Sequence, residues 1–408
     1  MTVIDDAAAR VEARVISDCR DIHQNPELGN REFRTAKLVA DRLRQLGIET
    51  RTGVAHTGVV GLLRGAREGH TVALRADMDA LPVREDVDVP FASKARTTYD
   101  GQEVGVMHAC GHDAHVAILL GVAEVLVKMR DQLAGSVKFI FQPAEEGAPQ
   151  GEEGGAELMV KEGVLENVDA IFGLHVSSRY PVGQIAYKPG AALAAVDTLR
   201  IVVHGKQTHG AYPWLGVDPI VTASQIILGL QTIPSRQLDS TLAPSIVTIG
   251  IIRGGVRNNI IPDDVEMAGT LRSLDKGMRE DIHARVKRTA EQIASSAGAK
   301  ADVTITRGYP MTYNDPALTA RMVPTLRRVA GMENIVLARA SLGAEDFAFY
   351  QEKVPGLFFW IGTRPKNQTA EEAASNHSPR FYVDESGLLL GVKAMASLAL
   401  ECGSLLPL

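Results

Sequence analysis

The segment 107–115, MHACGHDAH, concentrates side chains that bind metal ions, with three of the chain's eleven histidines and one of its three cysteines. Cys110 and His112 form a Cys-x-His pair in a glycine-flanked loop, and thiolate with imidazole suits zinc and neighbouring transition metals. A small buried cysteine beside a helix-capping histidine would give the same pattern, so the pair alone leaves both interpretations open. His108 and His115 suit orienting roles or substrate contact better than direct ligation.

Glu145 and Glu146 form a second candidate group, because they follow the apolar run FIFQ in the segment FIFQPAEEG. Adjacent carboxylates at a buried strand end repel each other unless a cation is present or one of them is protonated. A metal site resolves this conflict, since one glutamate binds the ion and the other takes a proton from acidified water. The alternative is a solvated acidic turn, because the chain continues as EEGAPQGEEGG.

Two further histidines and two aspartates complete the candidate site. His175 ends the apolar run AIFGLHV, His377 lies in the polar loop SNHSPR, and Asp77 and Asp79 follow a strand in LRADMDALP. Taken singly, each histidine could be an ordinary polar residue. The two aspartates suit acceptors that orient imidazoles, and Asp77 could equally form a turn. Because every candidate falls at the end of a predicted strand or the start of a predicted helix, we expect one edge of one sheet to collect them. Together they supply ligands for two metal ions about 3.5–4 Å apart; these are Cys110, His112, Glu146, His175 and His377.

The elements that must position these residues alternate along the first half of the chain. Short apolar runs bounded by glycine or acidic residues predict buried strands, and the long apolar pattern from residue 112 to residue 133 predicts a helix. Such alternation is typical of an α/β fold around a largely parallel or mixed sheet. The predicted strands are GVVGLLRG, TVALRAD, GSVKFIFQ and DAIFGLHV.

The chain of 408 residues is longer than the roughly 250–300 residues that one core usually supports, so two domains are expected. After the segment 187–195 the order becomes strand–helix–strand–strand–helix, which suits a small α+β domain inserted in the first. We therefore predict a first catalytic segment over residues 1–188, an inserted domain over residues 189–298 and a second catalytic segment over residues 299–408.

Composition narrows the class of protein. The formal net charge of −6 and the lack of a Lys/Arg block argue against a nucleic-acid partner. The N-terminus does not resemble a signal peptide, and no run approaches the roughly 20 apolar residues of a membrane-spanning helix. Three widely spaced cysteines, Cys19, Cys110 and Cys402, do not indicate a disulfide framework. We expect a cytoplasmic protein with reduced thiols and no membrane partner.

At the level of motifs, the sequence resembles the amidohydrolase branch of the aminoacylase/carboxypeptidase metallopeptidase family. That branch includes hippurate hydrolases, N-acyl-amino-acid amidohydrolases and indoleacetyl-amino-acid hydrolases. The likeness extends over roughly residues 20–395, and nine ordered motifs are far more specific than any one of them. The motifs are NPELGNREFRTA, LRADMDALP, MHACGHDAH, FIFQPAEEG, FGLHV, GKQTHGAYPWLGVDP, NNIIPDDVEMAGTLR, GAEDFAFY and SNHSPRFYVDE.

The resemblance implies a two-domain fold, in which a binuclear-metallopeptidase-like catalytic α/β domain carries an inserted α+β lid that dimerises. It implies two divalent metal ions, with Zn, Mn, Co or Ni all compatible with the ligands. By position, Cys110 matches the bridging cysteine of this branch and Glu145 the general base. The other metal ligands match His112, Glu146, His175 and His377. In the lid, His209 matches a histidine that reaches a neighbouring subunit's active site, and Asn259 and Arg272 match residues that hold the substrate.

The function expected from these observations is metal-dependent hydrolysis of the amide bond of an N-acyl amino acid, by a homodimer formed through the lid. The products are a carboxylic acid and a free amino acid. One alternative is a metallo-dipeptidase or aminopeptidase, which would need an anionic subsite for the substrate's ammonium group. A second alternative is a protein that binds acyl-amino acids without turnover, against which the presence of Glu145 argues.

Overall fold

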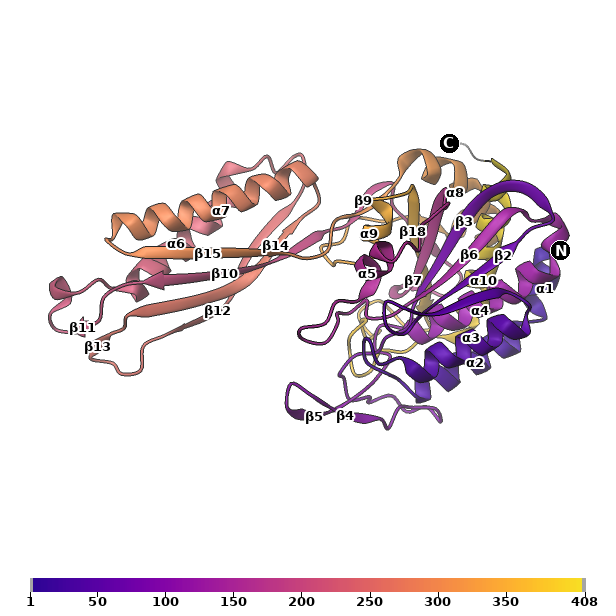
Figure 1. Cartoon of the computed structure of the whole chain (residues 1–408), viewed down its shortest axis with the longest axis horizontal. Coiled ribbons are helices and arrows are strands. Elements are labelled where there is room, and N and C mark those ends of the chain that lie inside the picture. Colours follow the sequence, from indigo (N-terminus) through magenta and orange to yellow (C-terminus); the bar gives the residue numbers. More distant parts are fainter. Residues whose placement is uncertain (1–2, 406–408) are drawn as a thin grey trace. The chain divides into compact units, whose positions relative to one another are not determined.

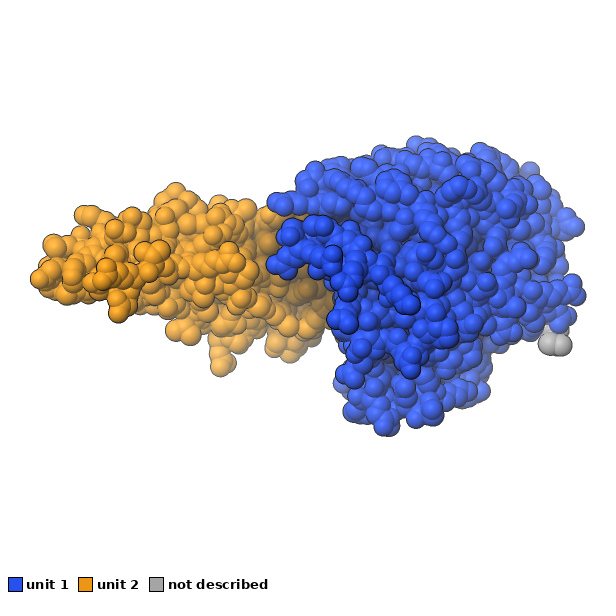
Figure 2. All heavy atoms as spheres, turned by 90° about the horizontal axis from the view of Figure 1, so that it is seen from below, with its two compact units in different colours: residues 1–190, 313–339, 349–408 blue, residues 191–312, 340–348 orange. Residues whose placement is uncertain are grey.

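The computed structural model describes residues 3–405 and divides into two compact units (Figure 2). Unit 1 comprises residues 1–190, 313–339 and 349–408, and unit 2 comprises residues 191–312 and 340–348. The chain therefore leaves unit 1 and later returns to it, as expected for a domain inserted in another. The predicted fold class, a two-domain α/β protein, is confirmed.

Unit 1 is built on an eight-stranded mixed sheet (Figure 1). Four central strands, β6, β3, β7 and β18, run parallel, whereas β1, β2 and β8 join through antiparallel pairs. Parallel neighbours place their carboxyl ends at one edge, where loops can gather functional side chains. The sheet order is β1 (Glu49–Val54), β2 (Gly58–Arg64), β6 (Ala134–Gln142), β3 (Arg67–Asp77), β7 (Ala170–Pro181), β18 (Gly356–Arg364), β8 (Ile185–Tyr187) and β17 (Ile335–Leu337).

Helices cover this sheet in layers (Figure 1). Helices α4 and α10 pack on its central strands, α3 packs on β1 and β2, and α8 packs on α10. An outer layer follows, with α2 against α4 and α1 against α10. The helices of unit 1 are α1 (Val3–Ala9), α2 (Glu12–Gln24), α3 (Phe33–Gln45), α4 (His112–Lys128), α5 (Gly155–Lys161), α8 (Pro316–Ala330) and α10 (Leu388–Leu405).

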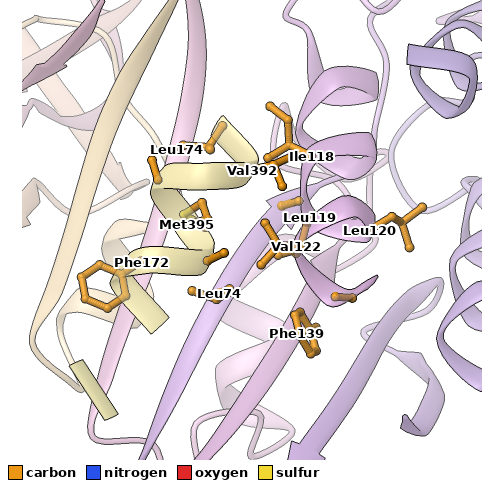
Figure 3. Close-up of a cluster of buried hydrophobic side chains, with 14 of the residues drawn as sticks. Leu74, Ile118, Leu119, Leu120, Val122, Phe139, Phe172, Leu174, Val392 and Met395 are labelled. Carbon is orange, nitrogen blue, oxygen red and sulfur yellow. The ribbon is translucent and has the colours of Figure 1, made fainter. Parts of the chain in front are cut away.

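Helix α4 is apolar on all sides, and other elements surround it. Nearly all of its side chains are buried, from His112 at its start to Leu126 in its last turn, and a helix with this composition belongs in a core. Figure 3 shows Leu119 and Val122 of α4 among side chains of α10 and the sheet, including Leu74 and Phe139. This packing fixes the N-terminus of α4, and therefore the loop before it, at the edge of the sheet.

The C-terminal segment corrects one expectation from the sequence. Within residues 385–404, a stretch of 18 residues has a mean hydropathy of 1.3, so this segment is long and apolar enough to cross a membrane. The sequence analysis predicts no such run. Of this stretch, 67% is buried inside unit 1, where α10 packs against α4, α8 and β3. The apolar composition is thus explained by a helix that is mostly buried in the core.

Unit 2 is a four-stranded antiparallel sheet with two helices packed on it. Apolar side chains of α6 and α7 pack on alternate residues of the strands, which gives this unit its own core. The sheet order is β12 (Ser245–Gly254), β14 (Asp264–Ser273), β10 (Ala195–His204) and β15 (Lys300–Arg307), and the helices are α6 (Pro219–Thr232) and α7 (Lys276–Ser296). A short ribbon of β11 (Thr208–His209) and β13 (Ile260–Ile261) belongs to the same unit.

The second boundary of unit 2 differs from the one expected at residue 298. Strand β15 pairs along its whole length with β10, from Asp197 opposite Arg307 to His204 opposite Lys300. A strand cannot be separated from the sheet whose hydrogen bonds it completes, so residues up to 312 belong to unit 2. The turn pattern after residue 296 marks the end of α7 and not the end of the unit.

The packing of unit 1 leads to a prediction about stability. Leu74 is fully buried beneath α4 and α10. Replacing it with alanine should lower the free energy of unfolding by about 2–5 kcal/mol, because the lost side chain leaves a cavity. Urea unfolding followed by circular dichroism measures this change.

The matched control is Leu337→Ala in β17, where the side chain is 67% exposed. That variant should differ from the parent by less than about 0.5 kcal/mol. Equal losses in the two variants would contradict the core position of Leu74.

Candidate metal centre

The carboxyl ends of three parallel strands place the candidate residues at one edge of the sheet. Asp77 ends β3 and pairs with Gln142, the last residue of β6, so Glu145 and Glu146 follow directly from the neighbouring strand. Arg75 of β3 lies opposite Gly173 of β7. Two residues further along both strands, His175 therefore lies level with Asp77. Sheet register alone brings these residues into one neighbourhood.

Cys110 and His112 reach the same edge from the start of α4. Gly111 between them has φ 88°, a left-handed conformation that favours glycine. A Cβ atom on Gly111 would lie 2.2 Å from a methyl carbon of Val176, so no larger residue fits there. The glycine thus allows Cys110 to lie beside β7 while His112 begins the helix.

The five predicted ligands form two groups of three that share one sulfur. In one group, Cys110, His112 and His175 offer ligand atoms that all lie within 4.8 Å of one another, and Cys110, Glu146 and His377 do the same in the other. The Cys110 sulfur lies 3.4 Å from His175 Nε2 and 3.3 Å from His377 Nε2. Glu146 Oε1 lies 3.0 Å from His377 Nε2. The arrangement could therefore hold two metal ions, with the Cys110 sulfur within reach of both donor groups.

The imidazoles are oriented as metal ligands require. His112 Nδ1 donates a hydrogen bond to Asp79 Oδ1 at 3.2 Å, and His175 Nδ1 donates to the carbonyl of Val176 at 2.7 Å. Each contact occupies Nδ1 and directs Nε2 toward the other candidate ligands, where a metal ion would bind in place of a proton. His112 Nε2 is buried, with no hydrogen-bond partner among residues 3–405. A buried, unpaired nitrogen facing a thiol and carboxylates is the feature that a bound cation explains.

The pKa shifts of the candidate ligands also favour a bound cation. Burial raises the pKa of the Cys110 thiol. Contacts with Cys110 and Glu146 raise the pKa of His377 to about 10, although burial opposes this. Burial favours the neutral form of Glu146, yet His377 and His112 hold its pKa below the usual value. The site thus favours positive charge beside its anionic donors, which is the role of a divalent cation in a metal centre.

A second layer of buried groups supports the ligands. Asp79 accepts the His112 bond on one oxygen and the backbone N–H of Glu146 on the other, at 2.9 Å. Asp77 accepts from Arg75 at 2.6 Å and from His115 Nδ1 at 2.5 Å. Asp77 therefore orients an imidazole, as the sequence suggested, but that imidazole belongs to His115.

His115 itself has no free nitrogen for a metal ion. Its Nε2 accepts the backbone N–H of Val176 at 2.9 Å, and its Nδ1 donates to Asp77. It therefore links β3 to β7 immediately beside His175. Among the described residues, both ring nitrogens of His108 lack a hydrogen-bond partner, and burial lowers its pKa to about 4. The neutral form of His108 is thus the stable one.

Motif analysis did not single out one buried ion-pair network behind α4. His23 Nδ1 lies 2.7 Å from Asp113 Oδ2, and His23 Nε2 lies 3.0 Å from Glu85 Oε1. Burial alone would lower the pKa of His23, but the two carboxylates raise it to about 10. The sequence contains one hint of this network, the position of Asp113 within MHACGHDAH. Its partners His23 and Glu85 come from distant segments, so no local motif reveals the pairing.

Glu145 lies next to the ligand groups, and a cleft lies beside them. Its side chain is 6% exposed, and its Oε2 is 4.0 Å from His112 Nε2. A cavity of about 910 Å³ in unit 1 is lined by Asp79 and Glu146 together with strand β4 (Arg96–Tyr99), which pairs with β5 (Gln102–Gly105). The candidate base therefore has both a metal-ligand set and an open space near it.

The three predicted lid residues lie in unit 2. His209 pairs with Ile260 in the β11–β13 ribbon, and the N–H of Gly210 donates to the carbonyl of Asn259 at 2.8 Å, so His209 and Asn259 are neighbours. Both are exposed. Arg272 is half-buried on β14 and donates to the carbonyl of Leu342 at 3.0 Å. The sequence thus identified two sets of residues, one in each unit.

An α/β sheet carrying buried Cys, His and Glu donors around a glutamate defines a class of protein, the metal-dependent hydrolases. Comparison with known sequences gives the family. Residues 73–401 match the model for peptidase family M20/M25/M40, and the chain belongs to that family. It is a metal-dependent hydrolase that acts on amide bonds, as the motifs predicted.

Individual relatives cover nearly the whole chain. "Thermostable carboxypeptidase 2" of Saccharolobus solfataricus is 45% identical over 96% of both chains. "N-acetylcysteine deacetylase" of Bacillus subtilis is 40% identical over 95% of this chain and 96% of its own. The crystal structure of the Bacillus subtilis YXEP protein, described as a dinuclear metal binding peptidase, aligns with a TM-score of 0.81 and 37% identity over 97% of this chain and 99% of its own.

The shared sulfur leads to a prediction about metal content. Replacing Cys110 with alanine removes a donor from both groups at once, so metal bound after dialysis against Zn²⁺ should fall from two ions per chain to fewer than one. Affinity should drop by at least about 10–100-fold, since even supporting residues of metal ligands have effects of that size. Elemental analysis of the dialysed protein measures the stoichiometry.

Cys402→Ala provides the matched control, because Cys402 is a buried free cysteine in α10 outside both ligand groups. It should bind as much metal as the parent. Full metal occupancy in the Cys110 variant would exclude the bridging role.

Proposed function

We propose that this chain hydrolyses the amide bond of N-acyl amino acids, releasing a carboxylic acid and a free amino acid. The observation that carries the proposal is the pair of ligand groups sharing Cys110, with the buried Glu145 carboxylate next to them. The name of the 40% identical N-acetylcysteine deacetylase supports this substrate class. A binding protein without turnover would have no need for a glutamate at that position.

Two divalent ions fit the donor set. Cys110, His112 and His175 would hold one, and Cys110, Glu146 and His377 would hold the other. The thiolate, imidazole and carboxylate donors suit Zn, Mn, Co or Ni. When bound, such ions act as Lewis acids toward a carbonyl oxygen and lower the pKa of water.

Glu145 serves as the proton carrier of the reaction. It accepts a proton from the attacking water as the oxygen bonds to the acyl carbon, and the carbonyl becomes tetrahedral. Glu145 then donates that proton to the amide nitrogen as the carbon–nitrogen bond breaks. One carboxyl group acts first as base and then as acid, so no second titratable residue is required.

Unit 2 supplies the residues for substrate recognition in this proposal. His209 and its neighbour Asn259 would donate to the oxyanion of the tetrahedral species. Arg272 would bind the carboxylate of the amino-acid half, for which a guanidinium has matching geometry. In unit 1, the cavity of about 910 Å³ beside Glu146 has room for a bulky acyl group, since pockets for small ligands measure roughly 300–1,000 Å³.

A carboxypeptidase is the second candidate, because a 45% identical relative carries that name. The chemistry is the same, since a peptide is an N-acyl amino acid whose acyl group is itself an aminoacyl residue. The two functions differ in whether the site tolerates a free ammonium group next to the scissile bond. A rate comparison between N-acyl amino acids and dipeptides separates them.

We also propose a homodimer that forms through unit 2. Strand β12 is at the edge of its sheet and exposes Ile246, Ile251 and Ile252. Unpaired edge strands with apolar side chains are typical of surfaces that pair with another chain. In the dimer, His209 would act at the partner subunit's site.

The cytoplasm is the proposed location of this protein. All three cysteines, Cys19, Cys110 and Cys402, are free and buried. Reduced thiols are the normal state in that compartment, and the bridging role of Cys110 requires one.

The test of function is a panel of N-acetyl, N-benzoyl and indoleacetyl amino acids and unblocked dipeptides, assayed with the parent and the Glu145→Gln variant. The parent should release free amino acid from the N-acyl compounds faster than from the dipeptides. The variant should lose about 100–10,000-fold in kcat, the usual contribution of a general acid–base group. Its metal content should stay at the parent value, because Glu145 belongs to neither three-residue ligand group that contains Cys110.

Asp169→Asn is a suitable control, because it changes a carboxylate immediately before β7, at the end of that strand opposite to His175. It should retain parental kcat. Parental turnover by Glu145→Gln would remove this residue from the mechanism, and faster dipeptide cleavage would favour the carboxypeptidase.

Subunit mixing tests the shared site. The His209→Ala and Glu145→Gln proteins are each expected to be inactive. After exchange, a mixed dimer combines an intact Glu145 from one subunit with an intact His209 from the other. Half of the dimers should be mixed and one site in each should work, so about a quarter of parental activity should return. No recovery after exchange has been proved by mass spectrometry would refute sharing.

A further inference from the structure

The segment Gly29–Glu32, part of the motif NPELGNREFRTA, has no role in the proposed reaction, yet it packs against the turn that carries both glutamates. We call residues 144–147 the glutamate turn. Glu32 Oε1 accepts the backbone N–H of Ala144 at 2.9 Å, immediately before Glu145. Glu32 is fully buried. A buried carboxyl group on a main-chain N–H next to the candidate base calls for an explanation, since burial of such a group is costly.

The glutamate turn is strained where Glu32 holds it. Ala144 has φ 51°, in the left-handed region, where the Cβ atom of a residue other than glycine crowds the backbone. Such a conformation persists only where surrounding contacts enforce it. The bond from Ala144 to Glu32 is one such contact, and the bond from Glu146 N–H to Asp79 is another, at 2.9 Å. The two carboxyl groups thus hold the turn on both sides of Glu145.

Close packing reinforces the hydrogen bond. A Cβ atom on Gly29 would lie 2.7 Å from the carbonyl oxygen of Gly147 and 3.1 Å from the Cα of Ala144. Glycine at this position therefore lets the two turns touch backbone to backbone. The other oxygen of Glu32 lies 2.5 Å from the hydroxyl of Thr57, which is also buried. Glu32 is thus itself held in place by a second element.

We propose that Glu32 is a positioning residue, whose hydrogen bond to Ala144 sets the place of the Glu145 carboxylate and of the Glu146 ligand. For Glu145, this inference rests on the proposed function. For Glu146, it rests only on metal binding. A loosened turn displaces both side chains, because each is attached to the strained backbone within two residues of Ala144.

The chemical state of Glu32 determines which substitution preserves its role. Burial, together with the nearby Asp79 carboxylate, raises the pKa of Glu32 to about 8. Glu32 accepts from the N–H of Ala144 on Oε1 and from the hydroxyl of Thr57 on Oε2. Glutamine keeps an acceptor for Ala144, and its amide N–H can pair with the Thr57 hydroxyl, which accepts as well as donates, whereas alanine offers neither bond.

The experiment compares Glu32→Gln with Glu32→Ala in the full-length, metal-loaded protein. Glu32→Ala should lose about 10–100-fold in kcat with little change in KM, because displacement of a reacting group by about 1 Å has effects of that size. Glu32→Gln should keep kcat within about threefold of the parent, since it restores both hydrogen bonds. A general loss of folded protein would lower kcat in proportion to the folded fraction, which thermal unfolding measures separately.

Zn²⁺ affinity of the metal-free proteins, measured by competition with a chromophoric chelator, is the second readout. It should fall about 10-fold in Glu32→Ala and stay at the parent value in Glu32→Gln. This measurement needs no substrate. If the parent cleaves no N-acyl amino acid, the proposed function fails. The comparison of Zn²⁺ affinities still tests the positioning role of Glu32.

Asp169→Asn is the matched control here also, because the Asp169 carboxylate accepts the backbone N–H of Thr71 at 2.8 Å, far along β3 from the glutamates. It should retain both kcat and Zn²⁺ affinity. Should Glu32→Ala not fold, Glu32→Asp replaces it, since shortening by one methylene withdraws the acceptor from Ala144. Parental kcat and Zn²⁺ affinity in the folded alanine or aspartate variant would overturn the proposal, as would equal losses in Glu32→Gln.

Discussion

The candidate metal centre of unit 1 depends on one sulfur atom that lies within reach of two groups of donors. Cys110 contacts His175 on one side and His377 on the other, and these histidines are 202 positions apart in the sequence. Sharing of the sulfur by two metal ions would require a thiolate, which burial alone disfavours. The proposed centre therefore needs positive charge beside the sulfur, and divalent cations would supply it.

This condition explains why so many buried charged groups surround the centre without being ligands. Asp79 fixes the tautomer of His112 and the backbone of Glu146, and Asp77 is neutralised by Arg75 and by the His115 hydrogen bond. Each of these carboxylates would be costly in an apolar core on its own. In partnership they hold donor atoms in fixed directions, so a metal ion meets a site that needs little rearrangement.

Two residues of the candidate site have positive φ values although they are not glycine. They are Ala144, beside the glutamate pair, and His377, a candidate ligand, and Gly111 adopts the same region without strain. Strained conformations of this kind persist where surrounding contacts determine them, and they often mark functional sites. The contacts here come from Val176, Glu32 and the strands of the sheet, which ties the chemistry to elements that contain no ligand.

Family membership identifies the type of reaction but not the particular substrate. The relatives include a protein named as a carboxypeptidase and one named as a deacetylase at similar identity. Both names describe cleavage of an amide bond, so a metal centre with Glu145 as its base, as proposed, would suit either reaction. In that proposal, specificity comes from residues away from the centre, such as those lining the cavity beside Glu146 and those of unit 2.

The amino-acid sequence by itself determined the donor types, the strand ends and the insertion of one domain in another, because residue chemistry, periodicity and motif order are local properties. It identified the five ligand candidates and the glutamate pair on that basis. Only the tertiary structure decided which donors share Cys110, that Asp79 and not Asp77 orients His112, that β15 completes the sheet of unit 2, and that Glu32 holds the glutamate turn. Those facts depend on contacts between segments tens to hundreds of residues apart, and strand register and helix packing create such contacts without leaving a local trace in the sequence.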